Sequence, residues 1–429
     1  NNRVALTLQA VPSRRAYVRK INVAGNTRTR DVVVRREFRQ LESSWYDGDK
    51  IRKSRDRVDR LGYFGDVSVE TQEVPGSPDQ VDLTLNVTEK PTGSLSLGAG
   101  FSSGDGLGLS FGLKQENAFG SGNSLGVQIN TSKINRVLVL NTTDPYFTAD
   151  GVSRTIDVYQ KTSSPYQDQS YYKLITSGAS MRFGVPFTEI DTVFFGAGYE
   201  KTTIEPGTLL PTSYQAYADE YGYSSSALPF TVGWARDSRD SSLAPTDGRY
   251  QRANAEWSFA GDARYLRATY QFQQYVPLSK QYTAAFNAEV GWGKAMGERS
   301  FPVFKNFYGG GLGSVRGFEQ GSLGPQDISG TAVGGARKVN LNMEVLTPFP
   351  GAGNDRTLRM YGFLDVGMVG GPDGGLAINA DADKLRASVG VGISWISPVG
   401  PLRLAFAKPI RKFDNDKIQS MQFQIGTSF

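Results

Sequence analysis

The feature that most constrains the fold is a series of short segments, between about residue 93 and residue 429, in which apolar and polar side chains alternate. A period of two is typical of β-strands whose two faces meet different surroundings. Sixteen segments share the pattern. Each strand and its connection then has roughly 21 residues, which suits membrane strands of ~9–11 residues. The segments lie near residues 94–102, 107–117, 122–132, 135–143, 153–162, 169–183, 191–201, 226–236, 248–259, 263–275, 280–293, 336–347, 357–369, 385–396, 401–408 and 420–429.

The connections between these segments fall into two groups. The tight turns include 118–123, 144–152, 184–191, 276–280 and 397–401, and the long connections include 202–225, 294–335 and 370–384. Short turns on one side and long loops on the other are typical of outer-membrane barrels. The even number of strands returns both ends to one side. Closure avoids edge amides without partners, which are costly in hydrocarbon.

A soluble β-sandwich and a β-propeller are the alternatives. No repeat of about 40–50 residues is visible, which disfavours a propeller. The last segment carries Phe423, Ile425 and Phe429 on one face, and an exposed apolar strand would promote aggregation of a soluble domain. We therefore predict a transmembrane antiparallel β-barrel of 16 strands over residues 92–429.

The composition excludes several classes of function. The chain has no histidine and no cysteine, so it has no Ser-His-Asp triad, no Cys nucleophile and no zinc site of the usual ligands. No run of about 18 apolar residues is present, which excludes a transmembrane helix. The net charge of +5 is too weak to indicate a nucleic-acid partner. The sequence therefore predicts neither an enzyme nor a cofactor.

The first 90 residues have a different, mixed pattern. Strand signals alternate with helical spacing, which predicts a module of order β-α-α-β-β. The first helix should begin at Thr29-Arg30-Asp31 and bury Val34, Phe38 and Leu41, and the second should begin after Asp47-Gly48-Asp49 and end before Gly62. The strands should lie near 17–23, 67–74 and 81–87, and a further strand at 4–8 should end a preceding module.

Motifs along the whole chain resemble the BamA family of outer-membrane assembly factors, in which POTRA modules precede a barrel. In the first module they are Val23-Ala24-Gly25-Asn26, Arg35-Arg36-Glu37, Leu61-Gly62-Tyr63-Phe64 and the stretch 74–82. In the barrel they are Thr92-Gly93-Ser94, Asp144-Pro145-Tyr146-Phe147-Thr148, the run 306–311 that leads into Val315-Arg316-Gly317-Phe318, the stretch 395–402 and the terminal Phe429.

The resemblance implies a domain organisation and a location. Residues 1–11 end a truncated preceding POTRA module, residues 12–91 form the membrane-proximal POTRA domain, and residues 92–429 form the barrel, with a long inward loop at 295–335. The barrel is expected in the outer membrane of a Gram-negative bacterium and the first domain in the periplasm. The chain departs from the family in having one complete POTRA module and short connections after Phe318 and near 162–169.

Arg316 is the sharpest candidate site. If its loop lies inside the lumen, as the resemblance implies, the guanidinium needs carboxylates, because an unpaired buried cation is costly. Glu344 and Asp365 on the following strands are the candidates, and a bidentate ion pair would fix the loop, with Val315, Gly317 and Phe318, to the wall. The alternative is a solvated loop arginine. The run 309–314 lacks Gly-Lys-Ser/Thr and is not read as a nucleotide site.

The seam between the first and last strands is the second candidate. The first strand is rich in Gly and Ser, so its pairing with the last strand should be weak. The resemblance implies that this seam opens sideways and pairs with strands of client proteins; the alternative is an ordinary seam. The predicted seam residues are Ser94, Leu95, Ser96, Leu97, Phe423, Ile425, Gly426 and Phe429.

The charged helices of the first module are the third candidate. Arg35, Arg36 and Glu37 are predicted to form one charged face, and the arginines and lysine between residues 52 and 60 another. Such faces are usually only solvated. By resemblance, one of them docks accessory outer-membrane lipoproteins.

Three functions are compatible with such a barrel. The first is insertion of client β-barrel proteins into the outer membrane, with unfolded clients, accessory lipoproteins and outer-membrane lipid as partners. The second is a secretion transporter of the same superfamily that exports one dedicated partner. The third is a diffusion porin, which the periplasmic module disfavours. The ending Trp395-Ile396-Ser397-Pro398-Val399-Gly400-Pro401-Leu402 favours the assembly factor over the secretion transporter.

Overall fold

The computed structural model describes residues 15–148, 150–164, 172–188, 190–241, 244–351, 357–371, 381–397 and 400–426. The chain forms two compact units, one of residues 1–94 with 114–125 and one of residues 95–113 with 126–429. The strand expected at 4–8 and the terminal Phe429 lie outside the described residues.

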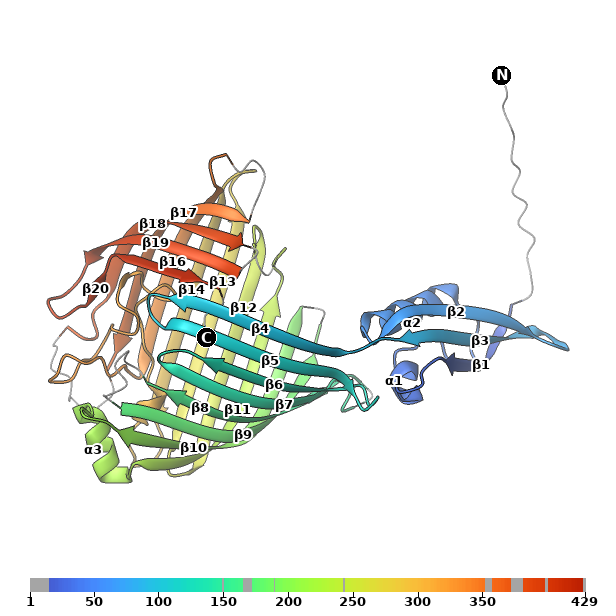
Figure 1. Ribbon diagram of the computed structural model, residues 1–429, viewed down its shortest axis with the longest axis horizontal. Helices are drawn as coiled ribbons and strands as arrows, with labels where there is room; N and C mark the ends of the chain where they lie inside the picture. Colours follow the sequence, from blue (N-terminus) through green and yellow to red (C-terminus); the bar gives the residue numbers. More distant parts are fainter. Residues whose placement is uncertain are drawn as a thin grey trace, which may run out of the picture. The chain divides into compact units, whose positions relative to one another are not determined.

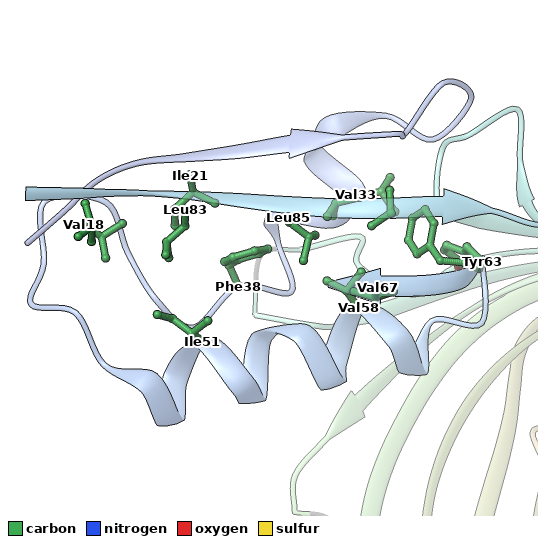
Figure 2. Close-up of a cluster of buried hydrophobic side chains, with 14 residues drawn as sticks. Val18, Ile21, Val33, Phe38, Ile51, Val58, Tyr63, Val67, Leu83 and Leu85 are labelled. Carbon is green, nitrogen blue, oxygen red and sulfur yellow. The ribbon is translucent and has the colours of Figure 1, made fainter. Parts of the chain in front are cut away.

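The first unit contains a three-stranded sheet of order β1-β3-β2 with two helices. The order β-α-α-β-β is the predicted one, and β1 runs parallel to β3. Val18, Leu83 and Leu85 are fully buried, and their side chains meet those of the helices in one apolar core (Figure 2). The elements are β1 (Tyr17–Ala24), α1 (Asp31–Arg35), α2 (Gly48–Arg60), β2 (Phe64–Val74) and β3 (Ser77–Glu89).

The second helix follows the sequence signals closely. Asp47 is the N-cap, and its side chain accepts hydrogen bonds from the backbone N–H groups of Asp49 and Lys50 at 3.0 and 3.1 Å. Ile51 and Val58 lie on the buried face. Gly62 follows the helix with φ +74°, which glycine adopts at little cost.

The first helix is shorter than predicted. It ends at Arg35, and Leu41, which was expected on its buried face, is 67% exposed. Its centre is a run of β-branched valines, which have modest helix propensity. The chain leaves the helix and still buries Phe38 in the core, so the expected i, i+4 pattern is satisfied by tertiary packing of a non-helical segment.

The second region is a closed barrel of sixteen strands, which confirms the predicted fold class and strand count. Every register described between neighbouring barrel strands is antiparallel (Figure 1). The strands are β4 (Gly93–Ser102), β5 (Gly106–Ala118), β6 (Asn123–Thr131), β7 (Asn135–Asp144), β8 (Ser153–Ser163), β9 (Tyr172–Pro186), β10 (Asp191–Pro206), β11 (Ser224–Asp237), β12 (Gly248–Gly261), β13 (Tyr265–Pro277), β14 (Thr283–Ala295), β16 (Arg337–Pro348), β17 (Leu358–Gly370), β18 (Arg386–Ser397), β19 (Gly400–Arg411) and β21 (Met421–Ile425).

The connections hold elements that the alternation did not reveal. Helix α3 (Thr212–Tyr221) lies in the connection between β10 and β11. The connection between β14 and β16 contains the short helix η1 (Val303–Lys305) and β15 (Gly317–Phe318), and β15 pairs with β20 (Ile418–Gln419). Within the described ranges, no helix combines the length and the apolar character of a transmembrane segment.

Side chains along the barrel strands alternate between exposed and more buried, as a membrane-spanning β-barrel requires. On β5, Leu107, Leu109, Phe111 and Leu113 are exposed, and the residues between them are glycine or serine and more buried. A contiguous row of large exposed apolar side chains marks a surface that contacts a membrane or another apolar partner. This face therefore fits contact with lipid.

Candidate functional site: the lumen loop and the seam

The connection at residues 296–336, here called the lumen loop, is buried around its motif. Val315 and Phe318 are 1% and 0% exposed, and with Leu323 and Val369 they form an apolar cluster. Gly317 has φ +89°, and a Cβ there would lie 3.1 Å from the Cβ of Ala407. The motif therefore combines a conformation that favours glycine with close packing against the barrel wall.

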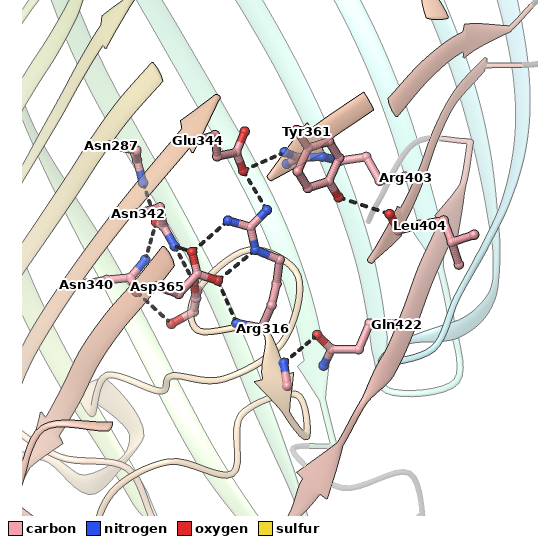
Figure 3. Close-up of polar contacts among 12 residues, drawn as sticks. Asn287, Arg316, Asn340, Asn342, Glu344, Tyr361, Asp365, Arg403, Leu404 and Gln422 are labelled. Atoms are coloured by element: carbon pink, nitrogen blue, oxygen red, sulfur yellow. Dashed lines mark hydrogen bonds and ion pairs between the residues drawn. The ribbon is translucent and has the colours of Figure 1, made fainter. Parts of the chain in front are cut away.

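Arg316 lies at the centre of this region and is 2% exposed. Its Nε and Nη2 atoms donate to Oδ2 and Oδ1 of Asp365 at 2.7 and 2.6 Å, a bidentate arrangement, and its backbone N–H donates to Oδ2 at 3.0 Å. Its Nη1 donates to Oε1 of Glu344 at 2.6 Å. The structure thus brings Arg316 together with both carboxylates named from the sequence (Figure 3).

A second layer of groups holds the two carboxylates. Glu344 also accepts from Nη2 of Arg403 at 3.2 Å. Asn342 donates from Nδ2 to Asp365 at 2.8 Å and to the carbonyl oxygen of Ser314 at 2.7 Å. The ring of Phe363 lies 3.6 Å from Cζ of Arg316. A buried pair with this many partners is worth little against an apolar replacement, but losing one partner costs about 3–5 kcal/mol.

A second cation of the lumen loop was not found from the sequence. Nζ of Lys305 lies 2.8 Å from Oε1 of Glu200 on β10 and 2.9 Å from Oε1 of Glu256 on β12. Tyr159 donates to Glu200 at 3.0 Å, and Tyr265 also hydrogen-bonds Glu256. The available signal was a lysine just before the run 306–311, together with carboxylates at lumen-facing positions of two strands.

The seam is short in the described residues. β21 pairs with β4 only at Gln424–Ser102 and Ile425–Phe101, whereas β9 and β10 pair at fifteen positions. Two further hydrogen bonds join Ser103 and Phe423: the N–H of Ser103 donates to the carbonyl of Phe423 at 2.9 Å, and the N–H of Phe423 donates to Oγ of Ser103 at 3.4 Å. The rings of Phe101 and Phe423 stack with centroids 5.6 Å apart.

The predicted seam residues do not all meet. Phe423 and Ile425 lie in the paired stretch, and Gly426 follows it, with its N–H bonded to Pro401 at 2.8 Å. Residues 94–97 lie on β4 outside the two described pairs, and Leu95 and Leu97 are 62% and 75% exposed. Among the described residues, the pairing is therefore at Phe101 and Ser102, at the end of β4.

The charged face predicted in the first module is not a single helical face. Arg36 and Glu37 follow the end of α1, and Glu37 is 3% exposed and paired with Arg57 at 2.7 Å. Arg35 donates from Nη2 to the carbonyl of Ile21 at 2.7 Å and also pairs with Asp31. All of these contacts lie within the first module, because the chain after Arg35 turns toward the core of that module.

An α/β module followed by a closed barrel with a loop fixed to its wall defines a class of outer-membrane barrel proteins. Residues 117–429 match the family model of the Omp85 superfamily domain, and residues 16–90 match that of POTRA, described as a surface antigen variable number repeat. The chain belongs to the Omp85 superfamily. It is an outer-membrane protein with its POTRA module in the periplasm, as the sequence predicted.

Named relatives are assembly factors. Outer membrane protein assembly factor BamA of Neisseria meningitidis serogroup B is 40% identical, over 99% of this chain and 58% of the relative. BamA of Nitratidesulfovibrio vulgaris is 30% identical, over 96% of this chain and 51% of the relative. The chain thus spans a little over half the length of these relatives. Their names describe assembly factors, not enzymes.

Two solved structures are also similar. BamA from Haemophilus ducreyi lacking POTRA domains 1–3 superimposes with a TM-score of 0.91 at 29% identity, over 97% of this chain and 85% of that chain. CdiB from Acinetobacter baumannii gives a TM-score of 0.58 at 14% identity, over 96% and 74%. The second match concerns the fold alone.

Proposed function

We propose that this chain is the membrane-embedded part of an assembly factor that folds and inserts client β-barrel proteins into the outer membrane through the β4–β21 seam. Unfolded client proteins and outer-membrane lipid are its partners. The short seam carries the proposal, because β21 and β4 pair at only two described positions.

The energetic argument starts from the ladder between neighbouring strands. Each buried hydrogen bond contributes about 0.5–1.5 kcal/mol net, so a junction with few pairs, such as the two described between β21 and β4, should open more easily than the fifteen pairs of β9 and β10. An opened junction presents unpaired N–H and C=O groups. In hydrocarbon these groups strongly favour pairing with another strand, which is the mode of recognition called β-augmentation.

The insertion step requires no chemical catalysis. A client strand that moves into lipid buries apolar surface, which contributes roughly 25 cal/mol per Å². The barrel then supplies an edge on which the client can pair. The absence of histidine and cysteine from the chain agrees with a role that depends on strand pairing alone.

Accessory outer-membrane lipoproteins are proposed as partners of the POTRA module. The exposed face of α2, with Arg52, Lys53, Arg55 and Arg60, suits such docking better than Arg35, Arg36 and Glu37. The reason is that Glu37 is buried and already paired. Charge reversal on α2 should weaken co-purification of the lipoproteins, and unchanged co-purification would contradict this site.

A disulfide across the seam tests the function. Ser102 and Gln424 are directly opposite, and Cβ atoms of opposite residues lie about 4.5–5.5 Å apart, close enough for a disulfide after modest adjustment. The chain has no cysteine of its own, so the Ser102→Cys/Gln424→Cys variant forms one defined cross-link. We expect the oxidised variant to lose client insertion into liposomes and the reduced variant to regain it.

The two single-cysteine variants are the controls, because they carry the same substitutions without the cross-link. Full insertion by the oxidised double variant would refute a seam-dependent mechanism. The secretion-transporter alternative predicts another result, namely that export through the pore continues while the seam is cross-linked.

A further inference from the structure

Gln422 lies on the last strand, β21, and is 1% exposed. Its Nε2 donates to the carbonyl oxygen of Phe318 at 2.7 Å, and its Oε1 accepts from the backbone N–H of Gly317 at 3.2 Å. One side-chain amide thus bonds two neighbouring peptide groups of the lumen loop, and Figure 3 shows it directed at that backbone. Neither the Arg316 ion pairs nor the seam pairs include this residue.

Further hydrogen bonds to the main chain of the last hairpin extend the same junction. Gly317 and Phe318 pair with Gln419 and Ile418 in the β15–β20 ladder. The N–H of Glu319 donates to the carbonyl of Lys417 at 2.9 Å, and Nε2 of Gln326 donates to the carbonyl of Asn415 at 3.0 Å. The lumen loop is therefore joined to the last hairpin along several consecutive residues.

The same part of the lumen loop reaches the first hairpin. Gly104 lies in the turn between β4 and β5, and a Cβ built on it would lie only 2.8 Å from Cγ of Gln320. Gln320 follows Phe318 by two residues, so the loop bonds the last hairpin and contacts the first within three residues. Residues 317–320 of the lumen loop therefore connect the last hairpin to the first, across the seam. We call this segment the strap.

We infer that Gln422 is a positioning residue that ties the lumen loop to β21 and thereby keeps the seam paired. The inference rests on the proposed function only in giving the seam a role. β21 has two described pairs with β4 and five with β19, so the bonds from the lumen loop are a substantial part of what holds this short strand. Arg316 anchors the other side of the loop to β16 and β17.

The test measures seam closure directly, in the full chain and without a client. The Ser102→Cys/Gln424→Cys pair serves as the reporter, and the rate of disulfide formation after addition of an oxidant reports how often the two strands are paired. Gln422→Met keeps the size of the side chain and removes the amide. Losing the two buried hydrogen bonds to the lumen loop, together with the longer one of 3.3 Å to Oε1 of Gln419, should slow disulfide formation by roughly fivefold to tenfold.

Gln128→Met is the matched control, because the amide of Gln128 on β6 bonds Asn130 of its own strand at 3.4 Å; it should leave the rate unchanged. Should Gln422→Met fail to fold, Gln320→Ala removes the contact with Gly104 and should slow the reaction to a smaller degree. An unchanged rate in the variant that folds would overturn the inference.

A double-mutant cycle separates positioning from a merely local role. Arg316→Met frees the lumen loop from β16 and β17, so the Gln422 amide then ties β21 to a loop without a fixed support. If Gln422 acts through the loop, Gln422→Met should slow the reaction much less in the Arg316→Met background. Equal slowing in both backgrounds would contradict the inference.

Insertion assays keep the two proposals distinguishable. A slower reporter reaction in Gln422→Met supports the strap whatever the insertion activity is. Insertion that persists with the seam cross-linked would refute the proposed function and leave the strap intact. An unchanged reporter rate, with insertion lost on cross-linking, would refute the strap and leave the function.

Discussion

The guanidinium of Arg316 and the carboxylate of Asp365 form a bidentate ion pair between a loop and a wall strand, with N–O distances of 2.6 and 2.7 Å. Asp365 is fully buried, and the backbone N–H of Arg316 donates to the same carboxylate. The pair therefore fixes both the side chain and the main chain of the loop motif.

Replacing Arg316 by alanine should release the lumen loop. The change leaves Glu344 and Asp365 without their buried cation, and removal of one partner of such a pair costs about 3–5 kcal/mol. We expect a lower melting temperature and new proteolytic cleavage within residues 296–336. Arg136→Ala, at an exposed position of β7, is the control. An unchanged digestion pattern in Arg316→Ala would count against a fixed loop.

Lys305 should anchor the lumen loop independently of Arg316. Its ion pairs with Glu200 and Glu256 reach strands on which Arg316 has no described partner. Lys305→Met should increase hydrogen exchange at residues 301–308, whereas the exposed Lys201→Met on β10 should not. Equal protection in Lys305→Met and the parent chain would show that the lysine is not an anchor.

The POTRA module should lose stability in acid through Glu89. Its carboxylate accepts from the backbone N–H groups of Arg28 and Thr29 and from the hydroxyl of Thr27, at 2.6 to 3.1 Å. Burial alone would raise the pKa of Glu89, but these hydrogen bonds outweigh it and lower the pKa below its usual value. The ionised form is therefore the one that the folded module favours.

The lowered pKa of Glu89 determines how the stability of the POTRA module changes with pH. A lowered pKa contributes stability above the unfolded value, about 4.3, and the contribution is lost as the pH falls through the folded-state pKa. Glu89→Gln should lower the stability of the POTRA module at neutral pH and flatten its loss below pH ~4. Glu73→Gln, at an exposed position of β2, should change neither. The measurement is the denaturant concentration at the midpoint of unfolding of the POTRA module, detected by hydrogen exchange at residues of that module.

The barrel could be predicted from the sequence because each strand repeats the same local rule. Alternation and turn residues depend on neighbours in the chain, so all sixteen strands were found with small errors at their ends. Glu344 and Asp365 were found for a similar reason, since carboxylates on strands next to a buried arginine are few.

The remaining features depend on contacts between distant residues. The early end of α1 accompanies the burial of Phe38 in the core of the module. The β15–β20 ladder forms because the lumen loop meets the last hairpin. Lys305 pairs with Glu200 and Glu256, which are so distant in the sequence that no local pattern connects them with the lysine. The position of the described seam pairs, at Phe101 and Ser102, depends on the register between the first and last strands.

Two glycines of β17 offer a sharp test of how closely the motif packs. A Cβ on Gly367 would lie 2.5 Å from Cγ2 of Val315 and 3.0 Å from the carbonyl oxygen of Val339, so one of them must move. A Cβ on Gly362 would have nothing nearer than the carbonyl oxygen of Gly390 at 4.0 Å. The same substitution on the same strand therefore meets a packed interior at one position and open space at the other.

Gly367→Ala should lower the free energy of unfolding by about 1–3 kcal/mol, the usual effect of overpacking a close contact. It should also expose residues 296–336 to protease, because Val315 is displaced beside Arg316. Gly362→Ala should stay within about 0.5 kcal/mol of the parent chain, as expected for a substitution away from packed groups. Equal stability of the two variants would mean that Val315 is not held against β17, and the lumen loop would then depend on its ion pairs alone.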